Sequence, residues 1–184
     1  MRICLTGGIA CGKSLLSCFL NEFGVATLDA DDVVHSLVPA DERRRLAEKV
    51  FRDPAARKAL ERRLHPIVKE RLRAFLDGPG DGLRVAVVPL VFEVQWDSEF
   101  DIICCVRSSR AKQIERMMTT RGYSREEAES RLAAQMDVEE KAARSQYVIE
   151  NEGTAGQLKE KAKEFVSWLK SSMCSPRRPG SSAR

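Results

Sequence analysis

The chain has 184 residues, of which 43% are hydrophobic and 32% charged, and its formal net charge is +4. This length suffices for one domain with a single core, or for a core and a small inserted subdomain, and no apolar run approaches the roughly 20 residues that a membrane span requires. The 31 basic and 27 acidic residues alternate along predicted helices, and only 6% of the residues are aromatic. Both features argue against a nucleic-acid-binding face, and the lack of a long apolar run argues against a membrane protein.

The N-terminal residues and the distribution of cysteines indicate in which cellular compartment the protein is expected. Met1 is followed at once by the first predicted strand, which leaves no room for a cleavable signal peptide, so we expect a cytoplasmic protein. The six cysteines fall mostly in predicted strands and helices, contain no C-x-x-C pair and are distant in sequence from the two histidines. We therefore expect reduced, small core residues and no zinc site.

The most informative motif is G-G-I-A-C-G-K-S at residues 7–14, which fits the phosphate-binding loop pattern G-x-x-x-x-G-K-[ST]. A short apolar strand is predicted over residues 2–6 and a helix over 15–23, so the loop joins a strand to a helix, as its mechanics require. Backbone N–H groups and the helix N-terminus would hold phosphates, Lys13 would reach the terminal phosphates, and Ser14 could ligate Mg²⁺. A chance glycine-rich turn is the alternative, which the complete spacing disfavours. A nucleoside triphosphate is thus predicted at Gly8, Ile9, Ala10, Cys11, Gly12, Lys13, Ser14 and Leu15, with Mg²⁺ at Ser14.

A second strand is predicted over residues 25–28, and three acids follow it: Asp29, Asp31 and Asp32. The carboxyl ends of parallel strands share one edge of a sheet, so an acid here can face the phosphate loop and act on an acceptor. Asp is also common as a helix N-cap, but three acids cannot all cap one helix.

Residues 41–75 are densely charged and show helical periodicity, which predicts two or three helices, one beginning at residues 53–54 and another beginning or kinking at His65-Pro66. From its spacing alone, His65 fits a structural or capping role better than a substrate contact. A loop is predicted over residues 77–82, and buried strands over 83–90 and 100–106. Glu93 lies between these strands, either holding Mg²⁺ or a substrate group, or exposed on a loop.

Residues 109–141 are helical and basic, with a break at Gly122-Tyr123. Arginines on a mobile helical hairpin can neutralise a moving phosphoryl group, so this segment is predicted to be a lid. Pairing with neighbouring glutamates is the alternative for each arginine. A last strand is predicted over 147–149 and an amphipathic helix over 154–173, and residues 175–184 are expected to form a disordered basic tail.

Taken in order, the motifs L-T-G-G-I-x-x-G-K-S, D-A-D, L-x-H-P, V-P-L-V-F-E, an arginine-bearing lid and V-I-x-N resemble the dephospho-coenzyme A kinase family from residue 2 to about 168. The resemblance implies transfer of the γ-phosphate of ATP to the ribose 3′-hydroxyl of dephospho-coenzyme A. The implied fold is a P-loop kinase-like, three-layer α/β/α domain over residues 1–174. Its sheet is five-stranded and mainly parallel, with a helical acceptor-binding subdomain at about 33–76 and a lid at about 109–141. We expect a monomer or small homo-oligomer.

The resemblance also implies residue roles. Asp31, the second acid of D-A-D, is the implied general base, and Lys13 stabilises charge on the phosphoryl group. Further implied contacts are Arg116 and Arg121 from the lid, Asn151 and Gly153 near the adenine of ATP, and Arg43 and His65 with Glu93 on the acceptor side.

The chain departs from the family pattern in three places. The span between His35 and Phe51 is shorter than usual, which trims the acceptor-side cap, and Leu15 stands where a threonine is usual. Ser145-Gln146 replaces an expected Ala-Asp. Two rival functions share the phosphate loop: a P-loop kinase for a nucleoside monophosphate, shikimate or gluconate, and a nucleotide-binding module without turnover.

Overall fold

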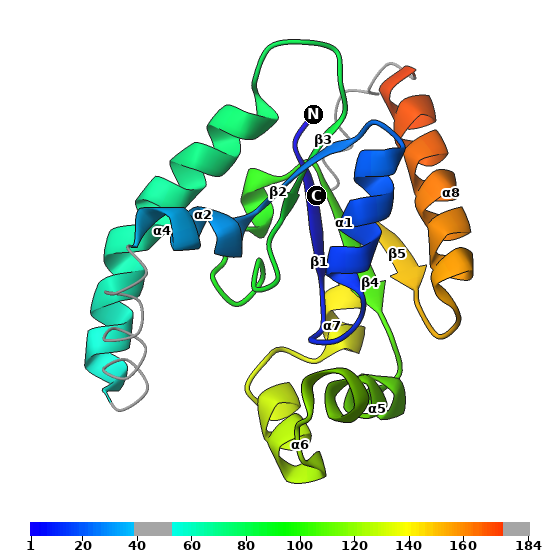
Figure 1. Cartoon of the computed structure of the whole chain (residues 1–184). Helices are drawn as coiled ribbons and strands as arrows, with labels where there is room; N and C mark the ends of the chain where they lie inside the picture. The colour runs from blue at the N-terminus through cyan, green and yellow to red at the C-terminus, as the bar shows by residue number, and fades with distance from the viewer. Residues whose placement is uncertain (39–52, 175–184) are drawn as a thin grey trace, which may run out of the picture.

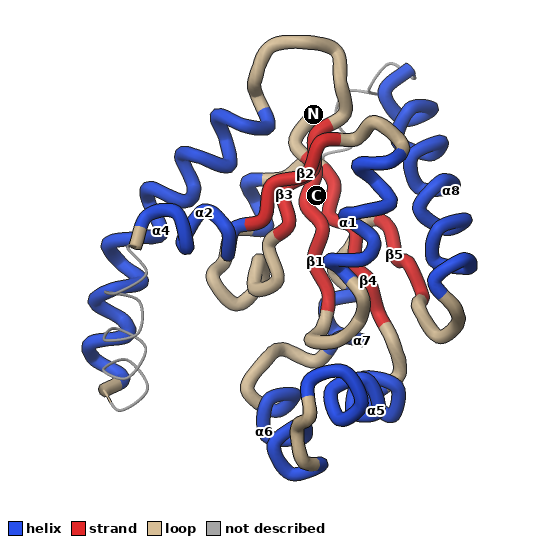
Figure 2. The backbone as a smooth tube through the Cα atoms, viewed as in Figure 1, coloured by secondary structure: helices blue, strands red, loops and turns tan. Residues whose placement is uncertain are grey.

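The computed structural model describes residues 1–38 and 53–174 and contains one five-stranded sheet (Figures 1 and 2). All pairings in the sheet are parallel, and the strand order is β2-β3-β1-β4-β5. The strands are β1 Ile3–Gly7, β2 Ala26–Asp29, β3 Arg84–Val87, β4 Ile102–Arg107 and β5 Tyr147–Glu150. The predicted five-stranded parallel sheet is confirmed.

Helices cover both faces of the sheet, which gives the predicted three layers (Figure 2). The described helices are α1 Lys13–Glu22, α2 Ala30–Leu37, α4 Pro54–Leu76, α5 Arg110–Arg121, α6 Arg125–Ala133, α7 Val138–Ala143 and α8 Ala155–Cys174, with a 3-10 turn η1 Asp97–Glu99. Helices α1 and α8 pack together on one face, and α4 packs on the other beside α2. No helix of the described residues is both long and apolar enough to cross a membrane.

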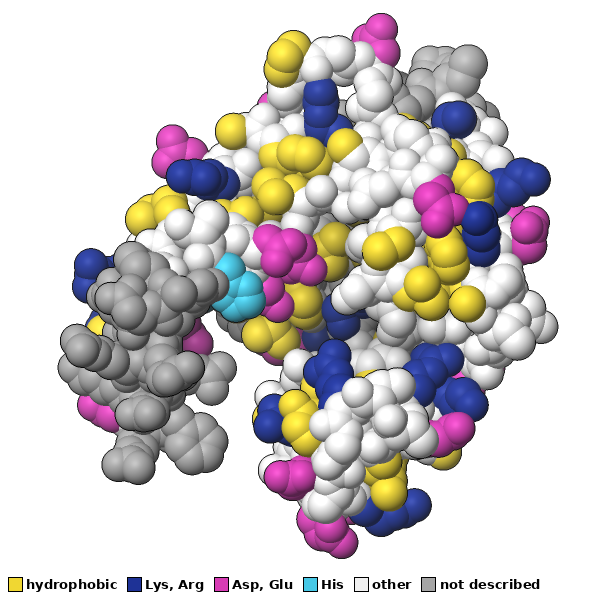
Figure 3. Space-filling model, in the orientation of Figure 1, with side chains coloured by type: hydrophobic (Ala, Val, Ile, Leu, Met, Phe, Trp, Pro, Cys, Tyr) yellow, Lys and Arg dark blue, Asp and Glu magenta, His cyan; other side chains and the backbone are white. Residues whose placement is uncertain are grey.

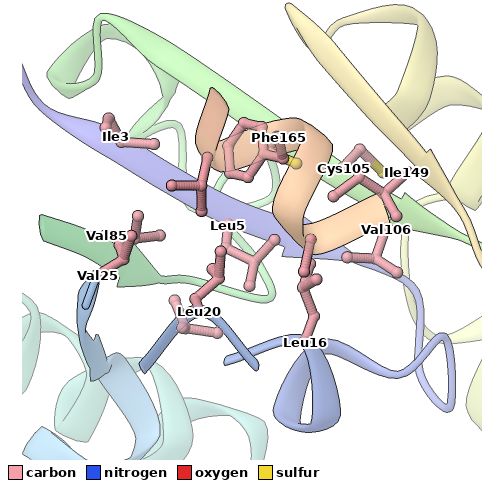
Figure 4. Packing of buried hydrophobic residues seen from close by; sticks show 14 of the residues in the cluster. Ile3, Leu5, Leu16, Leu20, Val25, Val85, Cys105, Val106, Ile149 and Phe165 are labelled. Atoms are coloured by element: carbon pink, nitrogen blue, oxygen red, sulfur yellow. The ribbon is translucent and has the colours of Figure 1, made fainter. Parts of the chain in front are cut away.

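Successive side chains of a strand point to opposite faces of the sheet, and so contribute to two separate hydrophobic cores. On β1, Ile3 and Leu5 face the core beneath α1 and α8, whereas Cys4 between them faces the core beneath α2 and α4. This is the two-residue period of a strand that is buried on both sides. Figure 4 shows the first core, where Leu16 and Leu20 of α1 meet the strand residues and Phe165 of α8.

Helices α5 and α6 form a hairpin that lies beyond the carboxyl ends of β1 and β4 (Figure 1). Gly122, at φ +67°, ends α5 in a left-handed conformation that glycine adopts without strain, so the predicted break is confirmed. A capping box begins α6: the Ser124 hydroxyl accepts from Glu127 N, and the Glu127 carboxylate accepts from Ser124 N. Both ends of the turn are therefore fixed locally.

One predicted strand end is wrong, and of the two alternatives at His65-Pro66 the start of a new helix is excluded. Strand β3 ends at Val87 rather than residue 90, because Pro89 has no N–H for the ladder and the chain turns there. No new helix starts at Pro66; α4 runs through it, and packing of Val68 and Leu72 against the sheet outweighs the local cost of an interior proline.

Free thiols are found, as expected, at Cys4, Cys11, Cys18, Cys104 and Cys105. Cys18, predicted to be a core residue, is exposed instead, because it lies on the outer face of α1. Residues 39–52 and 175–184, which include the predicted tail and Arg43, lie outside the described residues.

Candidate active site

A cavity of about 460 Å³ lies at the carboxyl edge of the sheet, between the phosphate loop, the start of α2 and helix α5. In Figure 3 a group of acidic side chains near the centre of this face lies opposite basic side chains at the edge of the α5–α6 hairpin. The cavity is lined by Ile9, Ala10, Gly12, Lys13, Ser14, Leu15, Asp29, Asp31, Pro89, Arg116, Thr120, Arg121 and Gln135. A larger cavity of about 550 Å³ lies along β5 and contains none of the predicted site residues.

The phosphate loop has the geometry that its glycines predict. Gly12 has φ +96°, and a Cβ atom there would lie 2.4 Å from Asn151 Nδ2, so this position admits only glycine without rearrangement. The Lys13 ammonium donates to Gly7 O at 3.0 Å and to Gly8 O at 2.8 Å. Burial lowers the pKa of Lys13. Its side chain is thus held across the mouth of the loop, where a phosphate would meet it.

Three successive carbonyl groups of this loop are held by side chains from distant segments. Gln113 Nε2 donates to Ile9 O at 2.7 Å, Arg116 Nη1 donates to Ala10 O at 3.2 Å, and Asn151 Nδ2 donates to Cys11 O at 2.9 Å. A loop with its carbonyls fixed in this way presents its N–H groups in a preset arrangement, which favours anion binding.

The structure separates the roles of the three acids after β2. Asp29 is the N-cap of α2 and accepts from Asp31 N at 2.9 Å, so its carboxylate serves the capping role that the sequence left open. Asp29 and Asp31 both line the cavity, whereas Asp32 is exposed outside it. Burial raises the pKa of Asp29, and the charges of Asp31 and Asp32 add to this rise.

Basic side chains enter the cavity from α5. Arg116 and Arg121 line it, as does Thr120 between them. Arg116 also donates to Ser108 Oγ at 2.9 Å and Asn151 O at 2.8 Å, so its guanidinium group is fixed from several sides. An arginine held in this way can receive a phosphate with little further loss of side-chain freedom.

Oxygen donors suited to Mg²⁺ meet in the same cavity. Ser14 is the second residue of α1 and follows Lys13 in the loop motif, and Asp29 and Asp31 line the same cavity. Mg²⁺ in nucleotide sites keeps several waters and binds one or two protein oxygens with substrate phosphates, so this hydroxyl–carboxylate set fits the ion. Among residues 1–38 and 53–174 there is no group of three metal-binding side chains that would form a complete protein cage.

Six predicted contacts among the described residues do not line this cavity: Gly8 and Cys11 of the phosphate loop, Asn151, Gly153, His65 and Glu93. Asn151 and Gly153 line a neighbouring cavity of about 300 Å³ at the end of β5. His65 lies on α4 with its ring 5.2 Å from that of Trp96. Glu93 is ion-paired with Lys141, Nζ to Oε1 2.6 Å, which rules out the exposed-loop alternative for this carboxylate.

Several residues of the site escaped sequence reasoning. Pro89, Thr120 and Gln135 line the cavity. Gln113 precedes Arg116 by three residues on α5, so helical spacing places both on one face, and this signal could have found it. No comparable local signal marks Lys141, whose side chain is fully buried.

Comparisons with known proteins decide the family. A family model described as dephospho-CoA kinase matches residues 1–43 and 40–157. The chain is 37% identical over 191 residues to the dephospho-CoA kinase of Geobacter sulfurreducens, covering 90% of this chain and 96% of that protein. The chain belongs to the dephospho-CoA kinase family. The dephospho-CoA kinase of Symbiobacterium thermophilum is 38% identical over 180 residues, covering 84% of this chain and 75% of the relative. The predicted family is confirmed.

Solved structures support the same fold. The protein TT1252 from Thermus thermophilus has a TM-score of 0.77 at 32% identity and covers 92% of this chain and 97% of its own. A dephospho-CoA kinase from Campylobacter jejuni has a TM-score of 0.71 at 22% identity, covering 94% and 98%. A shikimate kinase from Acinetobacter baumannii reaches 0.61 at 16% identity, covering 95% of each chain. The last two show the fold alone.

Proposed function

We propose that this chain transfers the γ-phosphoryl group of ATP to the ribose 3′-hydroxyl of dephospho-coenzyme A, giving coenzyme A and ADP. Membership of the dephospho-CoA kinase family supports this reaction. The observation that carries it is one cavity lined by the phosphate-loop lysine Lys13, the acid Asp31 and the arginines Arg116 and Arg121. Phosphoryl transfer needs these three elements: a phosphate cradle, a group that orients the acceptor, and cations for the transferring charge.

Asp31 is proposed to accept the proton of the acceptor hydroxyl and to orient its oxygen for in-line attack. Its side chain lines the cavity and leaves the cap of α2 to Asp29, so its carboxylate is available to an acceptor. Lys13, Arg116 and Arg121 stabilise the charge on the phosphoryl oxygens. Mg²⁺, held by Ser14 with help from Asp29, would supply further positive charge at the nucleotide phosphates.

The acceptor side is proposed to lie between α2 and α4, and the α5–α6 hairpin is proposed to close over the phosphates as a lid. The neighbouring cavity at Asn151 and Gly153 is of a size to receive the adenine of ATP. Arg43 and His65 remain proposed coenzyme-side contacts, by resemblance to the family.

A coupled ADP-release assay with Mg·ATP tests the reaction. Dephospho-coenzyme A is the acceptor, and AMP, adenosine, shikimate and gluconate are run in parallel. We expect ADP release that depends on dephospho-coenzyme A, with coenzyme A as product. Turnover with another acceptor alone would assign the chain to a sister kinase activity. ATP binding without any turnover would assign it to a nucleotide-binding module.

The Asp31→Ala variant tests the acceptor-side role. A positioned proton acceptor contributes on the order of 10²–10⁴ in rate, so kcat should fall by that range while ATP affinity stays within about twofold. Asp32→Ala is the matched control, because this adjacent acid is exposed outside the cavity and should leave kcat unchanged. Equal activity of both variants would remove Asp31 from the mechanism.

A further inference from the structure

The side chain of Lys141 on α7 is fully buried, with 0% of it exposed. Lysine is almost never fully buried unless it is paired, because desolvating the ammonium group is costly. A buried lysine therefore needs polar or charged partners, and the ammonium group of Lys141 contacts two residues of one turn near the active site, Pro89 and Glu93.

That turn follows β3. Lys141 Nζ lies 2.6 Å from Glu93 Oε1 and donates to Pro89 O at 2.8 Å. Pro89 O accepts a second hydrogen bond, from Thr6 Oγ1 of β1 at 3.1 Å. The Pro89 carbonyl is thus held between the central strand and α7, and the charge of Glu93 is balanced by the same ammonium group.

The position of this turn matters because Pro89 lines the active-site cavity together with Lys13, Asp29 and Asp31. Strand β3 ends two residues earlier, at Val87, so the sheet ladder no longer fixes the chain here. Side-chain donors then replace ladder hydrogen bonds in setting where this wall of the cavity lies.

Glu93 links the turn after β3 to the segment that follows the α5–α6 hairpin. Its Oε1 accepts from Met136 N at 3.2 Å, at the point where the chain returns from α6 towards α7. The preceding residue, Gln135, lines the cavity. Glu93 Oε2 is buried and has no hydrogen-bond partner among the described residues, so the carboxylate depends on Lys141 for the balance of its charge.

We infer that Lys141 is a positioning residue of the active site: through Pro89 and Glu93 it fixes the acceptor-side wall of the cavity and the return of the α5–α6 hairpin relative to each other. This inference rests on the proposed phosphoryl transfer at that cavity. Lys141 acts through these two residues and does not itself line the cavity. A loss of its ammonium group should therefore misplace the acceptor more than the nucleotide.

The test compares Lys141→Met, Lys141→Arg and the control Lys159→Met. Met keeps the unbranched shape and most of the length of the lysine side chain without its charge. Lys159 forms an ion pair of the same length, 2.6 Å, with Glu22 on the α8–α1 surface and does not line the cavity. For each variant we would measure kcat, KM for dephospho-coenzyme A, Kd for ATP, and amide hydrogen exchange over residues 88–95 and 134–138.

For K141M we expect kcat/KM for dephospho-coenzyme A to fall by about tenfold to a hundredfold, because small displacements of reacting groups have effects of that order. Kd for ATP should stay within about twofold, since the phosphate loop has its own anchors. Exchange over 88–95 and 134–138 should become faster. K141R should recover most of the loss, because a guanidinium group can donate to both acceptors. K159M should match the wild type in every measurement.

Unchanged kcat/KM in folded K141M would overturn the inference, and so would a lower melting temperature with normal turnover per folded molecule, which would mark a merely structural lysine. If K141M does not fold, the double variant K141M/E93Q, which leaves no unpaired charge, replaces it with the same expectations. Hydrogen exchange needs no acceptor, so it separates the two proposals. An inactive wild type would refute the reaction, whereas unchanged exchange in the variant would refute the role of Lys141.

Discussion

Asn151 offers a sharp test of how the phosphate loop is held. Its side chain is buried, and Nδ2 donates to Cys11 O at 2.9 Å across 140 residues of sequence. Asn151→Ala removes this donor and keeps the backbone carbonyl that accepts from Ser108 and Arg116. The perturbation is therefore confined to one hydrogen bond to the loop.

Its magnitude follows from that contact. A net hydrogen bond contributes about 1 kcal/mol, and leaving the Cys11 carbonyl without this donor costs about 1 kcal/mol more. We expect the free energy of unfolding to fall by about 2 kcal/mol. For a chain of this size that corresponds to a decrease in Tm of about 4–8 °C. Binding of ATP should weaken by up to about tenfold, since 1.4 kcal/mol corresponds to a factor of ten.

The assay is thermal unfolding of the unliganded protein together with ATP titration. Asn151→Asp adds a second comparison, because it keeps the size but sets a buried carboxylate against the Cys11 carbonyl, and it should be less stable than N151A. Asn21→Ala is the control: it removes an exposed hydrogen bond to Thr27 and should change stability by less than about 0.5 kcal/mol.

An unchanged Tm for unliganded N151A would refute the anchoring argument. If ATP affinity still fell in that case, Asn151 would act on the nucleotide directly, as the family resemblance implies. A wild-type Tm for N151D would refute the anchoring argument as well, because a carboxylate cannot donate to the Cys11 carbonyl.

Three further predictions concern the acid cap, the thiols and helix α4. Burial raises the pKa of Asp29, so the folded state holds this proton more tightly than the unfolded chain, and the free energy of unfolding falls as pH rises through the folded pKa. Asp29→Asn keeps an acceptor for Asp31 N, so the variant should be at least as stable as the wild type at pH 7 and should lose this advantage in acid. Denaturant titrations at pH 7 and 4 measure the two free energies of unfolding, and marked destabilisation at pH 7 would contradict the prediction. Among the described cysteines, Cys18 is exposed while burial raises the pKa of Cys105 to about 12, so native alkylation followed by mass spectrometry should label Cys18 first; early labelling of Cys105 would contradict the packing of β4. Pro66 is exposed inside α4 and denies Arg62 its helical donor, so Pro66→Ala should raise the free energy of unfolding by about 1–3 kcal/mol, and a lower value in denaturant titration would show that the proline ring packs usefully.

The sequence by itself determined whatever depends on neighbours along the chain. The phosphate loop, the strands that alternate around it and the break at Gly122 are local patterns, because dihedral preferences and periodicity act within a few residues. The site residues Lys13, Asp31, Arg116 and Arg121 were predicted from motifs, and the structure brings all four to one cavity. These residues could be predicted because each belongs to a short motif with a fixed position relative to the start or end of one helix or strand.

Only the tertiary structure decided relations between distant segments. Which acid caps α2 depends on where the chain turns after β2, and the burial of Lys141 depends on the turn after β3 lying beside α7, 52 residues from Pro89 in sequence. Helix α4 continues through Pro66 because packing of its buried face against the sheet stabilises the helix by more than the interior proline destabilises it. Such contacts join parts of the chain that no local pattern relates. The strand order of the sheet determines which distant segments become neighbours. A buried polar group without a hydrogen-bond partner would destabilise the fold, so these segments pair their polar groups with one another.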